Sequence, residues 1–171
     1  MEGMHSMQEK LDIKILILFI LRRLPAAVDG ATLAGLALGD DTVGYFEYAE
    51  CLAELEDSAH VERNGSMYAI TEKGNRNCEI VESSLPWTLR SRLEKKLSPL
   101  AEGMRRRAMI VTEHDGDDGA CRVHLSLSDG LGEIMDARLL CGSAAQAEKI
   151  EARFREEAEN LYNRVMEMLL E

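Results

Sequence analysis

The chain has few aromatic residues, few prolines and no surplus of positive charge. Only 5% of its 171 residues are aromatic and three are proline, so Leu, Ile, Ala and Met must fill any core. With 20 Lys and Arg against 31 Asp and Glu, the net charge is −11. Nucleic-acid-binding chains usually carry at least a basic stripe, because phosphate contacts supply much of their affinity. A DNA-binding hypothesis must therefore identify such a stripe.

Metal-binding and membrane-spanning patterns are also missing from the sequence. The four cysteines lie 20 to 43 residues apart, without a Cys-x-x-Cys pair or a histidine at metal-ligand spacing. We interpret them as reduced, buried thiols of a cytoplasmic protein that needs no cofactor. The apolar run from Ile13 to Leu21 is too short to span a bilayer. It predicts a buried helix, and we expect no membrane partner.

Catalytic motifs are absent as well, so we expect no enzyme. There is no Gly-x-Ser-x-Gly motif and no glycine-rich phosphate loop. His60, His114 and His124 could act as bases, but Cys121 and His124 are three residues apart and would lie on opposite faces of a strand. Residues 115–119 have the composition of a calcium loop without its spacing, and we predict a hairpin turn there.

Helical periodicity dominates the first part of the chain. After a polar leader of residues 1–10, the apolar segment 11–24 predicts a central helix that ends before Pro25. A second helix is expected over residues 31–38, and a third, capped by Thr42, over residues 43–57. Four residues are expected to share one face of the third helix, namely Tyr45, Tyr48, Leu52 and Leu55.

A short hairpin follows the third helix. Strands are expected over residues 60–63 and 67–70, joined by Asn64-Gly65-Ser66, and Asn-Gly is a strong hairpin signal. Thr71 can cap a fourth helix. This order of elements predicts a winged helix-turn-helix domain over residues 11–85. In such a domain the third helix faces the major groove, and the hairpin is the wing.

The next segment, residues 86–107, is expected to be a connector. Its helix covers residues 88–97 and is expected to break at Ser98-Pro99. Trp87 is expected to pack the connector down, with closure of a ligand pocket as the alternative.

Residues 108–171 form the last predicted region. Alternating apolar residues predict three antiparallel strands, and Ser143 caps a final helix over residues 144–170. The predicted fold class is therefore α+β, with an N-terminal winged helix-turn-helix domain followed by a small antiparallel sheet packed with a long C-terminal helix.

Several strings of the sequence are similar to those of one protein family. They are DIKILILFILRRLP (12–25), YFEYAECLAELEDS (45–58), MYAITEKG (67–74), SLPWTLRSRL (84–93) and the tail 123–170. They resemble a family of Gram-positive bacterial proteins of unknown function that is regarded as winged-helix and PadR-like. The resemblance covers about residues 11–170 and implies a regulator of transcription.

The third helix departs from the pattern of that family. Where the relatives carry Thr and Gln on its exposed side, this chain has Glu47 and Glu50, followed by Glu54. Carboxylates that face phosphates repel them, although glutamate can accept a hydrogen bond from cytosine. DNA binding would therefore need cations nearby.

Positive charge is concentrated in the connector. Residues 88–110 carry a net charge of +5, whereas residues 1–87 and 111–171 each carry −8. These cations can contact phosphates; the alternative is a solvated face that pairs with its acidic surroundings. The candidate DNA-binding residues are Tyr45, Glu47, Glu50, Arg63, Asn64, Arg92, Lys95, Lys96, Arg105 and Arg106.

Two functional hypotheses follow from these patterns. The first is a cytoplasmic transcriptional regulator that binds DNA as a homodimer, in response to a small-molecule effector, and has no catalytic step. Part of the final helix, including Met166 and Leu170, would then pair with a second copy. The alternative is a winged-helix module that senses a ligand or binds a protein and does not bind DNA. The acidic third helix favours this alternative.

Overall fold

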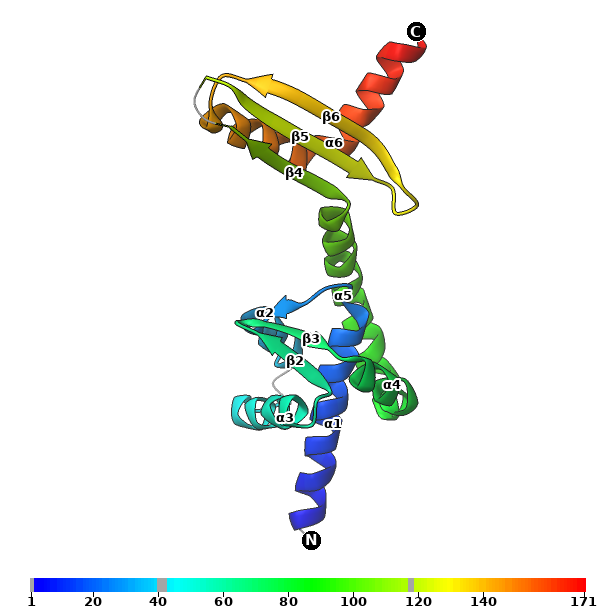
Figure 1. The fold of residues 1–171 in the computed structure, drawn as a ribbon. Helices are drawn as coiled ribbons and strands as arrows, with labels where there is room; N and C mark the ends of the chain where they lie inside the picture. Colours follow the sequence, from blue (N-terminus) through cyan, green and yellow to red (C-terminus); the bar gives the residue numbers. More distant parts are fainter. Residues whose placement is uncertain (1, 40–42, 117–118) are drawn as a thin grey trace. The chain divides into compact units, whose positions relative to one another are not determined.

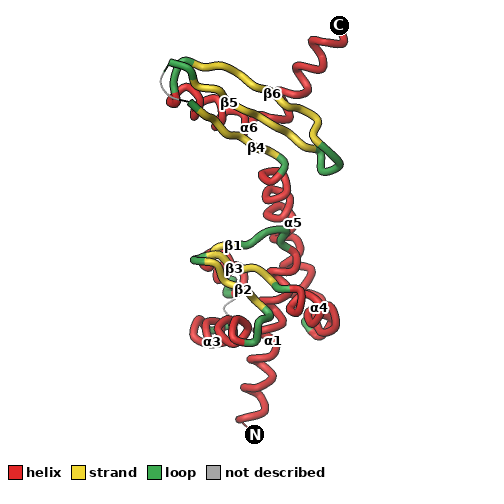
Figure 2. Tube along the Cα trace, in the orientation of Figure 1, coloured by secondary structure: helices red, strands yellow, loops and turns green. Residues whose placement is uncertain are grey.

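The chain consists of two compact units, residues 1–104 and residues 105–171. The structure is a computed structural model and describes residues 2–39, 43–116 and 119–171 (Figures 1 and 2). The first unit combines helices with a small sheet, and the second packs an antiparallel sheet against a long helix. The predicted α+β class is confirmed.

The first unit contains most of the helices. Its elements are α1 (Glu2–Arg23), β1 (Val28–Asp29), α2 (Gly30–Ala37), α3 (Tyr45–Asp57), β2 (Val61–Asn64), β3 (Met67–Ile70), α4 (Glu72–Val81), the 3-10 turn η1 (Glu82–Ser84) and α5 (Trp87–Ala108), which continues into the second unit. Helix α1 includes residues 2–10, the segment expected to be a polar leader. The predicted cap Thr42 lies outside the described residues.

Helix α1 is the centre of the first core. Ile17, Phe19 and Ile20 are fully buried, and α1 contacts α2, α3, α4 and β3. A helix that is apolar around most of its circumference needs partners on several sides, and the other helices of the unit supply them. This arrangement fixes α3 against α1.

The sheet of the first unit has three antiparallel strands in the order β1-β3-β2. Strand β1 was not predicted; it is two residues long and pairs Val28 with Tyr68. The hairpin turn is shorter than predicted, because Asn64 belongs to β2 and pairs with Met67. Gly65 has a φ of +61°, which glycine adopts without strain. Thr71 caps α4 as predicted.

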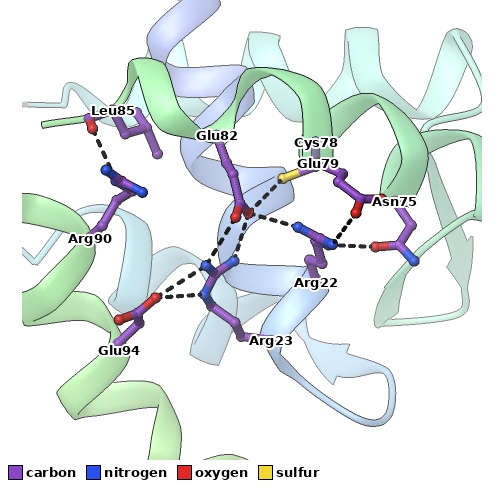
Figure 3. Close-up of polar contacts among 9 residues, drawn as sticks. All are labelled: Arg22, Arg23, Asn75, Cys78, Glu79, Glu82, Leu85, Arg90 and Glu94. Carbon is purple, nitrogen blue, oxygen red and sulfur yellow. Dashed lines mark hydrogen bonds and ion pairs between the residues drawn. The ribbon is translucent and has the colours of Figure 1, made fainter. Parts of the chain in front are cut away.

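A polar cluster joins the end of α1 to η1 and α5 (Figure 3). The carboxylate of Glu82 accepts hydrogen bonds from Arg22 at 3.0 Å and from Arg23 at 2.9 Å. Arg23 also pairs with Glu94 on α5 and lies over the ring of Phe19. The hydrogen bond from Arg23, aided by Arg22, lowers the pKa of Glu82. Glu82 thus fastens η1 to α1, and Arg23 fastens α1 to α5 through Glu94.

Helix α5 differs from the prediction at two positions. The helix does not break at Ser98-Pro99 but runs through Pro99. Proline removes one backbone hydrogen bond from a helix, yet Leu97 and Ala101 on either side are buried in the first core, and their burial offsets this loss. Trp87 is 72% exposed, so the predicted packing of Trp87 is wrong. As the first residue of α5, Trp87 points out of the core.

The second unit is a three-stranded antiparallel sheet with one helix. Its elements are β4 (Ile110–Asp115), β5 (Cys121–Ser128), β6 (Glu133–Cys141) and α6 (Ala144–Leu170), and the strand order is β4-β5-β6. The predicted bounds of the last helix are confirmed, and Ser143 caps it by accepting a hydrogen bond from the Gln146 amide. The turn predicted over residues 115–119 includes Asp117 and Asp118, which lie outside the described residues.

The two faces of this sheet differ in polarity. Cys121, Val123, Leu125 and Leu127 are buried in one cluster with Phe154 of α6. On the opposite face, His124 bonds Glu113 and Asp136, both at 3.0 Å. Cys121 and His124 therefore point to opposite faces, as their spacing predicts. Helix α6 covers the sheet with its first part only, and its last turns extend past the sheet (Figure 1).

Candidate nucleic-acid interface

Helix α3 begins at a glycine that is covered by a side chain. Gly44 is extended and precedes the first helical residue, and a Cβ on Gly44 would collide with the carboxylate of Glu47. The partial positive charge of a helix N-terminus stabilises a carboxylate in the first turn. The Glu47 carboxylate therefore lies over Gly44 at the start of α3, where the helix dipole favours a negative charge.

The buried face of α3 consists of Tyr48, Cys51, Leu52 and Leu55. Tyr45 does not belong to it: its side chain is 63% exposed and packs edge-on against Phe46, which is 85% exposed. Of the four residues expected to share one face, Tyr45 alone is exposed. A three-residue step rotates a helical side chain by about 300°, which displaces Tyr45 from Tyr48 toward the rim of the buried stripe. The start of α3 thus presents two exposed aromatic rings.

Lysines of α1 pair with two carboxylates of α3. The Lys10 ammonium lies 2.6 Å from Glu50 and 3.9 Å from Glu54, and Lys14 also pairs with Glu54. The hydrogen bond from Lys14 lowers the pKa of Glu54, and the hydrogen bond to Glu50 raises the pKa of Lys10. The negative charge of this side of α3 is therefore largely compensated within the molecule.

The lysine pair was missed at the sequence level, although a signal for it exists. Lys10 and Lys14 are four residues apart, and so are Glu50 and Glu54. Side chains four apart lie on one face of a helix, so two helices packed side by side can match these charges. Lys10 lies in the segment expected to be a polar leader, which instead belongs to α1.

The outward face of α3 is short and carries the exposed carboxylates of Glu47 and Glu50 beside apolar residues. Phe46, Ala49 and Ala53 are exposed along it, and acidic residues follow at the end of the helix. None of the 13 residues of α3 is Lys or Arg. Any phosphate contact must therefore come from other elements.

The β2–β3 hairpin presents Arg63 and Asn64, both exposed. The Arg63 guanidinium donates to the Gly65 carbonyl at 2.8 Å and lies 5.4 Å from the centroid of the Tyr68 ring. These contacts hold the arginine at the tip of the hairpin, where its remaining N–H groups face solvent. The hairpin thus supplies one positioned cation.

The predicted basic residues of α5 are divided between the two units. Arg92, Lys95 and Lys96 are exposed in the first unit, and the Lys96 ammonium lies beside Gly39, 3.4 Å from where a Cβ would stand. Arg105 and Arg106 belong to the second unit, where Arg106 forms a bidentate pair with Glu159 of α6 at 3.0 and 2.5 Å. At Arg106 the structure shows pairing with an acidic neighbour, the alternative left open by the charge pattern.

A cavity of about 400 Å³ adjoins the start of α3. Its lining residues come from α1, the end of α2, the start of α3 and the region from Leu85 to Leu93, all within the first unit. They are Lys10, Asp12, Ile13, Leu16, Leu36, Ala37, Val43, Gly44, Glu47, Leu85, Pro86, Leu89 and Leu93. An apolar floor with a few charged groups at the rim is typical of small-molecule sites. Sequence patterns could not predict it, because four separate segments build it.

Other kinds of site receive no support from the described residues. No group of three or more His, Cys, Asp or Glu side chains in that part of the chain is arranged to hold a metal ion. Within the same residues, no helix has both the length and the apolarity to cross a membrane.

The comparisons with known proteins give a family and no activity. A family model described as "Domain of unknown function (DUF4364)" matches residues 13–169. No curated protein and no solved structure matches the chain significantly. The match covers most of the chain and confirms the resemblance to a family of unknown function. The chain belongs to the DUF4364 family.

Proposed function

We propose that the protein is a winged-helix transcriptional regulator that binds DNA through α3 and the β2–β3 hairpin. The observation that carries the proposal is the arrangement of the first unit. Helices α2 and α3 follow one another, the hairpin comes next, and β1 closes the sheet beside β3. In winged helix-turn-helix domains the second helix of the motif enters the major groove and the hairpin contacts the adjacent backbone.

The charges of α3 are compatible with this role because α1 compensates them. Glu50 and Glu54 pair with lysines of α1, and the Glu47 carboxylate lies at the helix start. The remaining outward face can approach bases through apolar contact, as alanine and phenylalanine do with the thymine methyl group. Glu47 and Glu50 also stay candidates for accepting a hydrogen bond from cytosine.

Phosphate contacts are assigned to cations outside α3 and to the neutral donors Asn64 and Tyr45. Arg63 and Asn64 lie at the hairpin, and Tyr45 can donate its hydroxyl from the start of α3. Lys96 lies beside the end of α2, and Arg92 and Lys95 lie on the same helix as Lys96. Such contacts fix the orientation of a protein on DNA without reading its sequence.

A second copy and an effector complete the proposal. The last turns of α6 expose an apolar stripe that includes Leu161, Val165 and Leu169, and we assign it to pairing between two copies in the cytoplasm. A twofold dimer presents two recognition helices to half-sites about 34 Å apart. A small apolar molecule in the cavity would touch Gly44 and Glu47, and its binding would thereby bias the position of α3.

A second candidate function rests on the composition of α3. The helix has no cation and exposes Tyr45 and Phe46, and exposed aromatic residues are enriched in protein interfaces. A winged-helix module that binds a protein partner or senses a ligand without DNA would use this same face. DNA selection distinguishes the two functions.

The test is selection of genomic DNA fragments by the full chain at about 50 mM salt, where phosphate contacts are strongest. We expect enrichment of a small set of fragments. Arg63→Ala is expected to weaken binding to them. It should also reduce the slope of log affinity against log salt by about one, the contribution of one phosphate contact. Arg153→Ala is the matched control, because Arg153 is an exposed arginine of α6 in the second unit. Fragments recovered no better than from a mock selection would exclude the regulator and favour the interaction module.

A further inference from the structure

Two of the four cysteines lie directly opposite one another in the second unit. Cys121 is the first residue of β5, Cys141 is the last residue of β6, and the two are paired in the antiparallel ladder. Both are buried in the cluster beneath α6. The Cys141 thiol lies 3.4 Å from the Cys121 carbonyl oxygen, so its sulfur is turned toward the neighbouring strand.

The backbone at this pair has the spacing that a disulfide requires. Directly opposite residues of antiparallel strands have Cα atoms about 4.5 to 5.5 Å apart, and disulfides bridge Cα separations of about 4.4 to 6.8 Å. All four cysteines are free thiols in the structure. Cys51 and Cys78 have other partners, since Cys51 approaches the Lys10 carbonyl and Cys78 approaches Glu82.

We propose that Cys121 and Cys141 form a peroxide-sensitive thiol pair, which oxidation converts into an intrachain disulfide between β5 and β6. The Cys141 sulfur attacks the peroxide, giving a sulfenic acid and releasing one water. The Cys121 sulfur then attacks the sulfenic sulfur, forming the S–S bond and releasing a second water. Hydrogen peroxide is the oxidant, and the two thiols supply both electrons and both protons.

The order of the two steps follows from position. Cys141 ends its strand beside Gly142 and keeps 9% of its surface exposed, whereas Cys121 is fully buried. A peroxide molecule therefore reaches Cys141 first. Burial raises the pKa of the Cys121 thiol, which makes it the slower nucleophile toward peroxide but leaves it beside the sulfenic acid that it must attack.

The product would fasten the sheet next to the start of α6. Ser143, two residues after Cys141, caps α6, and the Cys141 thiol also approaches the Ser143 carbonyl. Oxidation thus crosslinks the strand end from which the last helix begins. This modification site does not depend on DNA binding.

The proposal is tested on the full reduced chain treated with hydrogen peroxide, followed by alkylation of the remaining thiols and peptide mapping. We expect Cys121 and Cys141 to be lost together, with the loss of two hydrogen atoms and one crosslinked peptide pair, before Cys51 or Cys78 reacts. In Cys121→Ser, a sulfenic acid should accumulate on Cys141 and be trapped by dimedone. Cys51→Ser and Cys78→Ser, the matched controls, should leave the crosslink unchanged.

Several results would overturn it. They are equal oxidation of all four thiols, a disulfide between two chains on a non-reducing gel, or loss of one thiol of the pair without the other. If a serine variant does not fold, mapping of the unmodified chain alone decides between these outcomes. The order in which the four thiols are oxidised in a urea-unfolded sample serves as the reference that does not depend on the fold.

Discussion

Helices α1 and α6 are the long helices that organise the two cores, and they are buried to very different extents. In α1, every residue from Ile15 to Leu21 is buried. In α6 the buried residues are Ala147, Glu151, Phe154 and Ala158. A helix enclosed on all sides determines stability, whereas a helix covered on one side keeps surface for a partner.

The largest expected effects break each core separately. Phe19→Ala in α1 and Phe154→Ala in α6 should each cost about 3–5 kcal/mol of unfolding free energy, because both side chains are buried. Since the chain forms two compact units, each change should lower the thermal transition of its own unit, as measured by calorimetry and hydrogen exchange. A single common transition that both variants lower alike would contradict the division into two units.

A smaller effect is expected at the polar end of α1. Glu82→Gln removes the carboxylate that accepts from Arg22 and Arg23 and should cost about 2 kcal/mol at neutral pH, measured by urea unfolding. Glu79→Gln is the control, since Glu79 is exposed and lies 3.8 Å from Arg22; it should change stability by less than about 0.5 kcal/mol.

The pH dependence of this effect follows from the lowered pKa of Glu82. A carboxylate with a lowered pKa contributes its stability above the unfolded value, about 4.3, and loses it as the pH falls through the folded value. The difference between wild type and Glu82→Gln should therefore disappear in acid. A stability difference that persists at low pH would show that Glu82→Gln destabilises the fold by something other than loss of the carboxylate charge.

The smallest expected effect concerns the sheet face that α6 leaves open. Hydrogen bonds to Glu113 and Asp136 raise the pKa of His124, with Arg138 nearby opposing them. The charged imidazole therefore stabilises the second unit fully below its ordinary pKa, about 6.5, and this contribution is lost as the pH rises through the raised value.

The measurement is the melting temperature of the second unit between about pH 5 and about pH 8, the range in which histidine changes charge. Wild type should lose stability relative to His124→Gln as the pH rises. His114, which bonds Glu151 on the α6 side, is kept in both proteins, so the difference between them reports on His124 alone. A difference that is flat with pH would exclude the assigned role of His124.

Local patterns were sufficient to predict the elements that depend on neighbours in sequence. Ser143 and Thr71 cap their helices as predicted, because a cap involves residues within one turn. Strand β1 is too short to give an alternating pattern, and it exists because β3 offers it an edge. The continuation of α5 through Pro99 likewise depends on burial of its neighbours. Tertiary packing therefore determines β1 and the continuation of α5, which local sequence signals could not predict.

The candidate site was predicted less completely than the fold. The carboxylates of α3 were identified, but their compensation by Lys10 and Lys14 depends on the packing of α3 against α1. The cavity beside Gly44 depends on four segments. Residue types indicated which side chains could contact DNA or a ligand. Only the arrangement of the helices showed which groups surround them.

We propose that α1 compensates the α3 carboxylates and so permits α3 to approach DNA. It is tested most directly by the affinity for a selected DNA fragment of wild type, Lys10→Gln/Lys14→Gln, and the same pair combined with Glu50→Gln/Glu54→Gln. The double variant should bind about tenfold more weakly, the cost of about 1.4 kcal/mol of added repulsion, and the quadruple variant should recover. Lys149→Gln/Arg153→Gln, which removes two cations from α6, is the control. Equal losses in the control and the double variant, or no recovery in the quadruple variant, would show that α1 does not compensate α3 for DNA binding.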